Sequence, residues 1–368
     1  MSSNTIKSLI NVSYCSKYAG VFPFQINSDG NVTLSKIWLI WSILTQSFFI
    51  AVLILVLQSE IFALILSSDE SLALVLTLCE VTLFLVTIIV HIIWIIKCRQ
   101  QLENAFLILA EFEFENIAVG EKKKKIMCFL GLITLPLADC ITSGIDFTAT
   151  LFSLADYLQS TFLFVAIFQF TDMLKILDSC FIYITDSLKT SEKLNISRPV
   201  LKQHLEYNNK LIECGQILNE CFGPLLLLVL VSSFAIISFS LYYIYNFWQY
   251  PDVTTTCAGW VTIFLIAFHS IVKSCENTVD KADDFYKCIS DLLIKDEQIS
   301  IDNNIQLMIL NGNKMKFTAF GYFTINYGLF CSMLAASVSY FLVIIEFKNL
   351  SKNGKENNNN ILNDTTTS

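Results

Sequence analysis

The sequence predicts an all-α membrane protein with seven transmembrane helices, a cytoplasmic N-terminus and an extracellular C-terminus. The first observation is composition: 54% of the 368 residues are hydrophobic and only 15% are charged, against about 25% charged residues in ordinary soluble domains. The second is that apolar runs of roughly the 20 residues that a helix needs to cross a bilayer recur along the chain. The third is the side on which lysine and arginine gather. One soluble core cannot hide this much apolar surface.

Seven apolar runs are the expected spans. They are residues 37–57, 72–96, 126–150, 158–184, 222–248, 257–272 and 317–347. Spans one to four with their loops therefore occupy 37–184, and spans five and six occupy 222–272. The preceding segment, 1–36, is polar and lacks the charged-apolar-small pattern of a cleaved signal peptide, so we expect it to stay in the cytosol.

Two segments between the spans are too polar for the membrane and too long for simple loops. Residues 185–221 carry apolar side chains near helical spacing, which predicts an amphipathic helix leading into the fifth span; these are Leu201, Leu205, Ile212 and Leu218. Residues 273–316 continue the sixth span as a charged helix, with a break near Gly312. We expect both as cytosolic helical extensions. The tail, 348–368, is rich in Asn, Thr and Ser and is predicted to be disordered.

The distribution of basic residues gives the orientation. The connectors after spans one, three and five contain no lysine or arginine, whereas the opposite side carries clusters such as Lys97, Arg99 and Lys122–Lys125. Because cytoplasmic loops are enriched in basic residues, the N-terminus is predicted inside and the C-terminus outside. A G-protein-coupled receptor has the reverse arrangement, and its Asp-Arg-Tyr and Asn-Pro-x-x-Tyr sequences are absent from this chain.

No residue pattern in the sequence indicates catalysis, a cofactor site or nucleic-acid binding. The three histidines, His91, His204 and His269, lie in separate segments, and a lone histidine in a membrane helix is more often a hydrogen-bonded structural group than a metal ligand. The 12 cysteines are scattered without a CxxC pair, which is not typical of a zinc site or a disulfide framework. There is no glycine-rich phosphate loop and no basic stripe. We expect neither an enzyme nor a metal or cofactor site.

The last span carries a stripe of small and polar residues that ends in a carboxylate. Its members follow at helical steps of three and four and share one face; they are Ser332, Ala335, Ser339, Val343 and Glu346. Small residues on a membrane helix can serve close helix packing. An ionisable group near the hydrocarbon region usually faces water or an ion path, although Glu346 could also sit at the headgroup boundary. The stripe is therefore either a packing face or a pore lining.

The end of this span resembles the C-terminal signature of insect gustatory receptors, which reads Thr-Tyr, five apolar residues and Gln-Phe. The matching residues are Ser339, Tyr340, Glu346 and Phe347. The lead-in from Phe317 to Asn326 also resembles that family, and residues 218–223, followed by an apolar run and Tyr242, Tyr243 and Tyr245, are similar to its fifth helix. This chain departs from the signature with Ser339 for Thr and Glu346 for Gln.

The resemblance implies a ligand-gated, non-selective cation channel in the plasma membrane of sensory neurons. Such channels are implied to be tetramers, homomeric or formed with related receptors, whose cytosolic extensions build an anchor where subunits meet. Pore gate and selectivity then carry over onto Val343, Glu346 and their neighbour Ser339. An apolar ring closes a pore by dewetting and an acidic ring favours cations. Because Glu346 adds a charge, we expect stronger cation preference or divalent-ion block.

The resemblance also implies a pocket for a small tastant, a sugar or a bitter compound, in the outer half of spans two to six. Candidate lining residues combine polar anchors with aromatic surface; they are Asp139, Asp146, Gln159, Phe162, Tyr242, Tyr245, Trp248 and Trp260. Tyrosine and tryptophan also gather at membrane interfaces whatever the function. The alternative class is a metabotropic seven-helix receptor or a transporter. It predicts ligand responses that need G proteins, or flux without channel currents.

Overall fold

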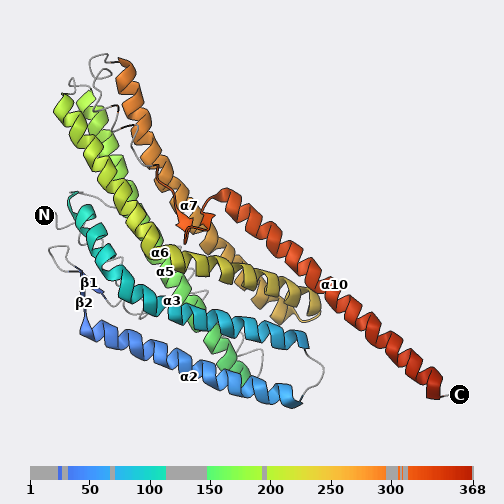
Figure 1. The fold of residues 1–368 in the computed structure, drawn as a ribbon. Helices are drawn as coiled ribbons and strands as arrows, with labels where there is room; N and C mark the ends of the chain where they lie inside the picture. The colour runs from blue at the N-terminus through green and yellow to red at the C-terminus, as the bar shows by residue number, and fades with distance from the viewer. Residues whose placement is uncertain are drawn as a thin grey trace.

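The computed structural model describes residues 24–26, 32–66, 71–112, 147–192, 197–295, 306, 309 and 314–366. These residues form long helices and four short strands (Figure 1). The helices are α2 (Lys36–Leu66), α3 (Ser71–Ala110), α5 (Phe147–Glu192), α6 (Arg198–Asn246), α7 (Pro251–Lys295) and α10 (Tyr327–Thr366). The strands form two antiparallel pairs, β1 (Phe24–Ile26) with β2 (Val32–Leu34) and β3 (Thr318–Ala319) with β4 (Phe323–Thr324).

Four of these six helices contain a whole expected span, and α6 and α10 contain most of the spans 222–248 and 317–347. The third expected span, 126–150, lies outside the described residues except for its last four, which begin α5. Four described helices each contain an apolar stretch long enough to cross a membrane; these helices are Ser160–Thr190, Arg198–Asn246, Val253–Lys295 and Tyr327–Phe347. A fifth candidate is the pair Leu85–Trp94 and Ile96–Leu109 within α3, bent by 51°.

The core lies where α5, α6 and α7 run side by side (Figure 1). Its largest buried side chains are aromatic and contact one another across the helices. Phe164 of α5 lies with its ring centroid 5.2 Å from that of Phe264 of α7, and Phe170 of α5 lies 5.3 Å from Phe222 of α6. Tilted ring pairs at these separations stabilise a core beyond their buried area. The α5–α7 aromatic core therefore fixes the three helices to one another.

Helix α2 has polar residues toward the bundle and apolar residues on its outer surface. Ser42 and Gln46, one turn apart, are buried, whereas Ile37, Ile40 and Leu44 are 76%, 58% and 57% exposed. In water this arrangement would be unfavourable, because the exposed apolar side chains would not gain the free energy of burial. In a bilayer it is favourable, because lipid tails solvate the apolar face and the polar groups find partners inside. The exposure pattern therefore supports a lipid-facing surface on this helix.

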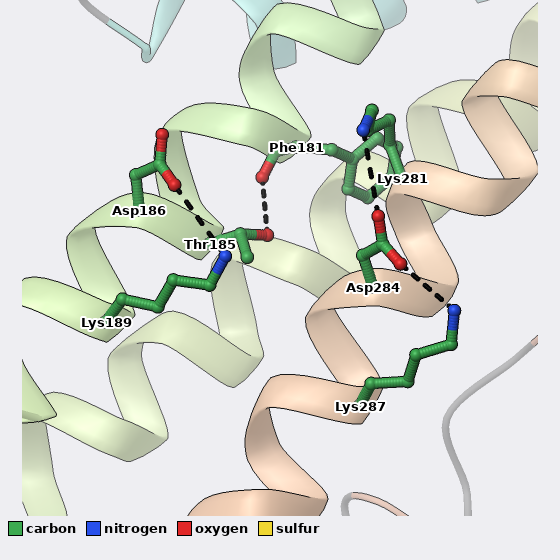
Figure 2. A network of polar contacts seen from close by, with 7 residues as sticks. All are labelled: Phe181, Thr185, Asp186, Lys189, Lys281, Asp284 and Lys287. Carbon is green, nitrogen blue, oxygen red and sulfur yellow. Dashed lines mark hydrogen bonds and ion pairs between the residues drawn. The ribbon is translucent and has the colours of Figure 1, made fainter.

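The far ends of α5 and α7 carry charged surfaces. Figure 2 shows Lys189 beside Asp186 on α5, and Asp284 of α7 between Lys281 and Lys287. Thr185 Oγ1 donates a hydrogen bond to the carbonyl of Phe181 at 2.8 Å. Exposed pairs of this kind add little stability, but they are suited to water rather than lipid. Residues 185–192, 198–221 and 273–295 are therefore helix that continues beyond the apolar stretches.

Two expected boundaries differ from the structure. Residues 317–326 do not belong to the last helix, which begins at Tyr327; they contain the β3–β4 pair. Phe320 and Gly321 both have positive φ, 52° and 80°, and two such residues in succession form a tight hairpin turn. The Thr, Phe, Tyr and Ile of this segment suit a strand as well as a membrane helix, which is why hydropathy missed the hairpin.

The tail, 348–368, is expected from its sequence to be disordered, but the structure shows helix there. Helix α10 continues to Thr366, and its C-terminal part extends beyond the other helices (Figure 1). Once a helix has been nucleated, each further residue adds a hydrogen bond at little cost, even in polar sequence.

Candidate functional site

The first half of α10 lies across α6. Met333, Ser337 and Ile344 follow at steps of four and seven and are buried on one face of α10. Two aromatic contacts fix the crossing: the ring centroid of Tyr340 lies 5.8 Å from that of Phe234, and that of Phe341 lies 6.1 Å from that of Tyr245. Helix α10 thus has a defined packing face toward its own bundle.

The residues of the expected pore stripe lie on the other side of α10. Ser339, Val343 and Glu346 are exposed, Val343 by 42%. The Ser339 hydroxyl donates to the carbonyl of Ala335 at 2.9 Å, inside the same helix. A hydroxyl that donates in this way keeps both of its lone pairs available to accept from water. Within one protomer, the stripe is therefore no packing face for α6 and points away from the bundle.

The other two signature residues have different surroundings. Tyr340 is 48% exposed and contacts α6 through its ring, whereas Phe347 is 70% exposed. Tyr340 therefore helps to fix α10 on α6, while Phe347 faces outward.

The start of α10 is held by two carbonyl-type acceptors. Asn326 Oδ1 accepts from the backbone N–H of Leu329 at 2.8 Å, which is an N-cap. Glu276 of α7 places its Oε1 3.3 Å from the N–H of Tyr327, where a carboxylate also complements the positive end of the helix dipole. The cap could have been recognised from an asparagine just before the helix. The contribution of Glu276 could not, because it comes from another helix.

The expected ligand residues fall into two groups among the described side chains. Phe162 and Trp260 belong to the interior: Phe162 is buried with its ring 4.4 Å from that of His91, and Trp260 lies 6.0 Å from Phe264. The second group lies at the end of α6 and in the turn after it; it comprises Tyr242, Tyr245 and Trp248, of which the last two are 53% and 73% exposed.

The polar members of the expected pocket are Asp139, Asp146 and Gln159. Asp139 and Asp146 lie outside the described residues, and Gln159 lies on α5 with its side chain outside them. Tyr245 and Trp248 are as exposed as aromatic side chains that anchor a helix at the membrane–water interface. Phe162 and Trp260 are thus the two candidates that contact the helix-bundle interior.

A buried polar pair joins α2 to α3. Gln46 Nε2 lies 3.0 Å from His91 Nδ1, and His91 is fully buried with its ring stacked 6.1 Å from that of Trp94. The amide donates to the neutral ring nitrogen at this distance. His91 is therefore a hydrogen-bonded structural group. Its partner could have been suspected from the sequence, because Gln46 is the one amide in the first apolar run. Within the described part of the chain, no three histidine, cysteine or acidic side chains gather as a metal site.

Comparison with known proteins identifies the family. The profile of the family described as 7tm chemosensory receptor matches residues 12–350 of this chain. The chain belongs to the 7tm chemosensory receptor family. This is a family of receptors and not of enzymes, and membership confirms the resemblance that the motifs indicated.

Individual relatives of this chemosensory receptor are distant in sequence. It is 24% identical over 166 residues to a protein named putative gustatory receptor 28b from Drosophila melanogaster; the match covers 42% of this chain and 35% of the relative's length. The structure is similar to that of the insect olfactory receptor OR5 from Machilis hrabei in complex with eugenol, with a TM-score of 0.65 and 14% identity. That match covers 93% of this chain and 98% of the other. A second structure of OR5 from Machilis hrabei gives a TM-score of 0.63 at 13% identity and the same coverage.

These matches confirm the fold class. The chemosensory receptor is a mostly helical, multi-pass membrane protein with the fold of the olfactory receptor. The likeness extends over nearly the whole of both chains, so the long helices that continue past the apolar stretches belong to the shared fold. The direction in which the termini point stays a prediction from the basic residues.

Proposed function

We propose that this chemosensory receptor is a ligand-gated, non-selective cation channel of the plasma membrane, with its N-terminus in the cytosol. The observation that carries the proposal is the outward face of α10, where Ser339, Val343 and Glu346 lie exposed and away from α6. A carboxylate at the end of an apolar helix is costly against lipid. The carboxylate is favourably solvated if the same face of several protomers surrounds water.

The proposed pore forms between protomers, four by the family resemblance and either identical or related. Copies of Val343 then make an apolar ring that closes the passage by excluding water, and copies of Glu346, about one turn further along, make an acidic ring that attracts cations. Opening needs only a small separation of the α10 helices at Val343. Ser339, one turn before Val343, supplies a hydroxyl to the same passage.

The proposed ligand is a small tastant, a sugar or a bitter compound, in the outer half of the bundle. Apolar and aromatic surface with a few polar anchors suits such a pocket. Phe162 and Trp260 supply aromatic surface: Trp260 reaches the α5–α7 aromatic core through Phe264, and Phe162 contacts the ring of His91. Asp139, Asp146 and Gln159 remain the proposed polar anchors. A ligand opens the channel if it binds the open arrangement of the helices more tightly than the closed one. Expression in sensory neurons is part of the same proposal.

Excised-patch recording from cells that express this chain alone tests the proposal. Sucrose, caffeine and eugenol serve as the first probes, and extracellular Ca²⁺ is varied to measure block. We expect cation currents without added G protein or nucleotide, and we expect Glu346→Gln to weaken divalent block and cation preference. Glu213→Gln, an exposed carboxylate on the extension of α6, is the matched control and should change neither.

Ligand responses that appear in intact cells but never in excised patches would refute the channel and favour a metabotropic receptor. Currents whose selectivity and block are unchanged by Glu346→Gln would refute the acidic ring. The symmetry of the purified particle reports the number of protomers.

A further inference from the structure

Two segments that the sequence analysis singled out separately meet in the structure. Asn219 lies in the motif 218–223 of α6, and Thr318 lies in the segment that precedes α10. The Asn219 amide makes two hydrogen bonds to this one residue: Oδ1 accepts from the Thr318 N–H at 2.7 Å, and Nδ2 donates to Thr318 Oγ1 at 3.2 Å. A two-point contact fixes orientation as well as distance. The α6 motif is thereby bound to the β3–β4 hairpin, residues 317–326.

A close backbone approach reinforces this contact one turn further along α6. A Cβ atom added at Gly223 would lie 3.2 Å from the backbone nitrogen of Phe320 and 3.3 Å from its Cα. These are backbone atoms of the hairpin turn and cannot move aside as a side chain can. Pro224 follows at once inside α6, and a proline in a helix interior bends it. Figure 1 shows α6 changing direction where the hairpin lies.

The hairpin itself is stiff. Its turn residue Phe320 has a φ of 52°, a conformation that non-glycine residues adopt only when the surroundings impose it. The N–H of Gly321 donates to Thr318 Oγ1 at 3.2 Å, and the N–H of Ile325 donates to the carbonyl of Phe317 at 2.9 Å. The ring of Phe317 is buried and lies 6.1 Å from that of Phe170 in the aromatic core. The chain then passes through the Asn326 cap directly into α10.

We propose that Asn219, Gly223 and Thr318 form a clamp that fixes the first turn of α10 to the bend of α6. Any displacement of α6 at this bend then carries the start of α10 with it, because the hairpin between them is too stiff to absorb the motion. The link to opening of a pore rests on the proposed function. Asn219 and Thr318 are positioning residues in this scheme: they touch neither the ligand nor the ion path, and they set where α10 lies.

Hydrogen–deuterium exchange of the full chain in lipid nanodiscs tests directly whether the clamp holds the hairpin and the start of α10 in place. Asn219→Ala and Thr318→Ala each remove two hydrogen bonds and should speed exchange of peptides that cover 317–330 by at least about two- to twelvefold, the effect of one lost hydrogen bond. Thr318→Ser keeps the hydroxyl and should restore slow exchange. Thr324→Ala is the matched control, because Thr324 pairs with Thr318 in the hairpin but is exposed. Unchanged exchange in Asn219→Ala, or an equal rise in Thr324→Ala, would overturn the clamp.

Single-channel recording without added ligand tests whether the clamp affects opening of the proposed pore. Asn219→Ala and Thr318→Ala should change the open probability in the same direction, and the double variant should change it no further. Unit conductance should stay the same, because Val343 and Glu346 are untouched. Faster exchange at 317–330 with an unaltered open probability would overturn the coupling. A wild-type chain without any current would refute the proposed channel instead, and the exchange experiment would still decide whether the clamp exists.

Discussion

The buried pair of Gln46 and His91 is the interaction whose removal has the most definite expected result. It joins α2 to α3 at 3.0 Å, and both side chains are at most 7% exposed. His91→Leu leaves the Gln46 Nε2 group buried without its acceptor, and Gln46→Leu removes the amide donor from His91 Nδ1. Neither orphan can turn to water inside the bundle, so both single variants should lower the stability of the folded protein.

The magnitude follows from the burial of the two groups. Leaving a buried polar group unpaired costs about 1–3 kcal/mol, and hydrogen bonds between membrane helices contribute roughly 0.6 kcal/mol on average and up to about 1.7 kcal/mol. We therefore expect about 1–3 kcal/mol of destabilisation in each single variant. The double variant Gln46→Leu with His91→Leu should lose less than the sum of the two by about 0.6–1.7 kcal/mol, because no orphan remains.

Unfolding of the purified protein in nanodiscs, followed by denaturant or temperature, measures the cycle. Gln100→Leu is the matched control, since Gln100 is exposed, and it should leave the midpoint nearly unchanged. Strict additivity of the two single changes would show that Gln46 and His91 do not interact. A double variant that is less stable than additivity predicts would contradict the orphan argument altogether.

Two further predictions concern the ion path and the helical extension. Val343→Ser should raise the open probability without ligand in patch recordings, because a polar ring no longer excludes water; Val338→Ser, exposed on a different part of α10, should not. Burial lowers the pKa of His204 below its ordinary value of 6.5, so the unfolded chain binds a proton there more readily than the folded one. Stability should therefore fall as pH decreases through about 6.5, and thermal unfolding of His204→Gln between pH 7.5 and 5.5 should show a smaller fall. An identical fall in the variant would assign the pH dependence to other groups.

Hydropathy determined the main features of the fold. The runs at 37–57 and 158–184 lie in long helices of the structure, and 222–248 lies in one except for its last two residues, because an apolar run of this length has no stable alternative to a helix in lipid. The signature that begins at Ser339 identified the family, which the profile match confirmed. The same signature placed Ser339, Val343 and Glu346 on one helical face, because three- and four-residue steps are a local property of the helix.

Tertiary structure decided what no local pattern could express. The apolar run 317–347 predicted Phe317 within a membrane helix. Phe317 instead lies in the hairpin, contacts Phe170 and leads the chain back onto α6. Asn219 and Thr318 are 99 residues apart, and Gln46 and His91 are 45 apart. Such pairs follow from how the helices cross. The sequence alone determined which segments are apolar, which of them are helical except at the two ends of α10, and which face of α10 is polar, since these depend on neighbours along the chain. Only the tertiary structure decided which buried polar groups become partners and where α10 begins, because both depend on contacts between segments far apart in sequence.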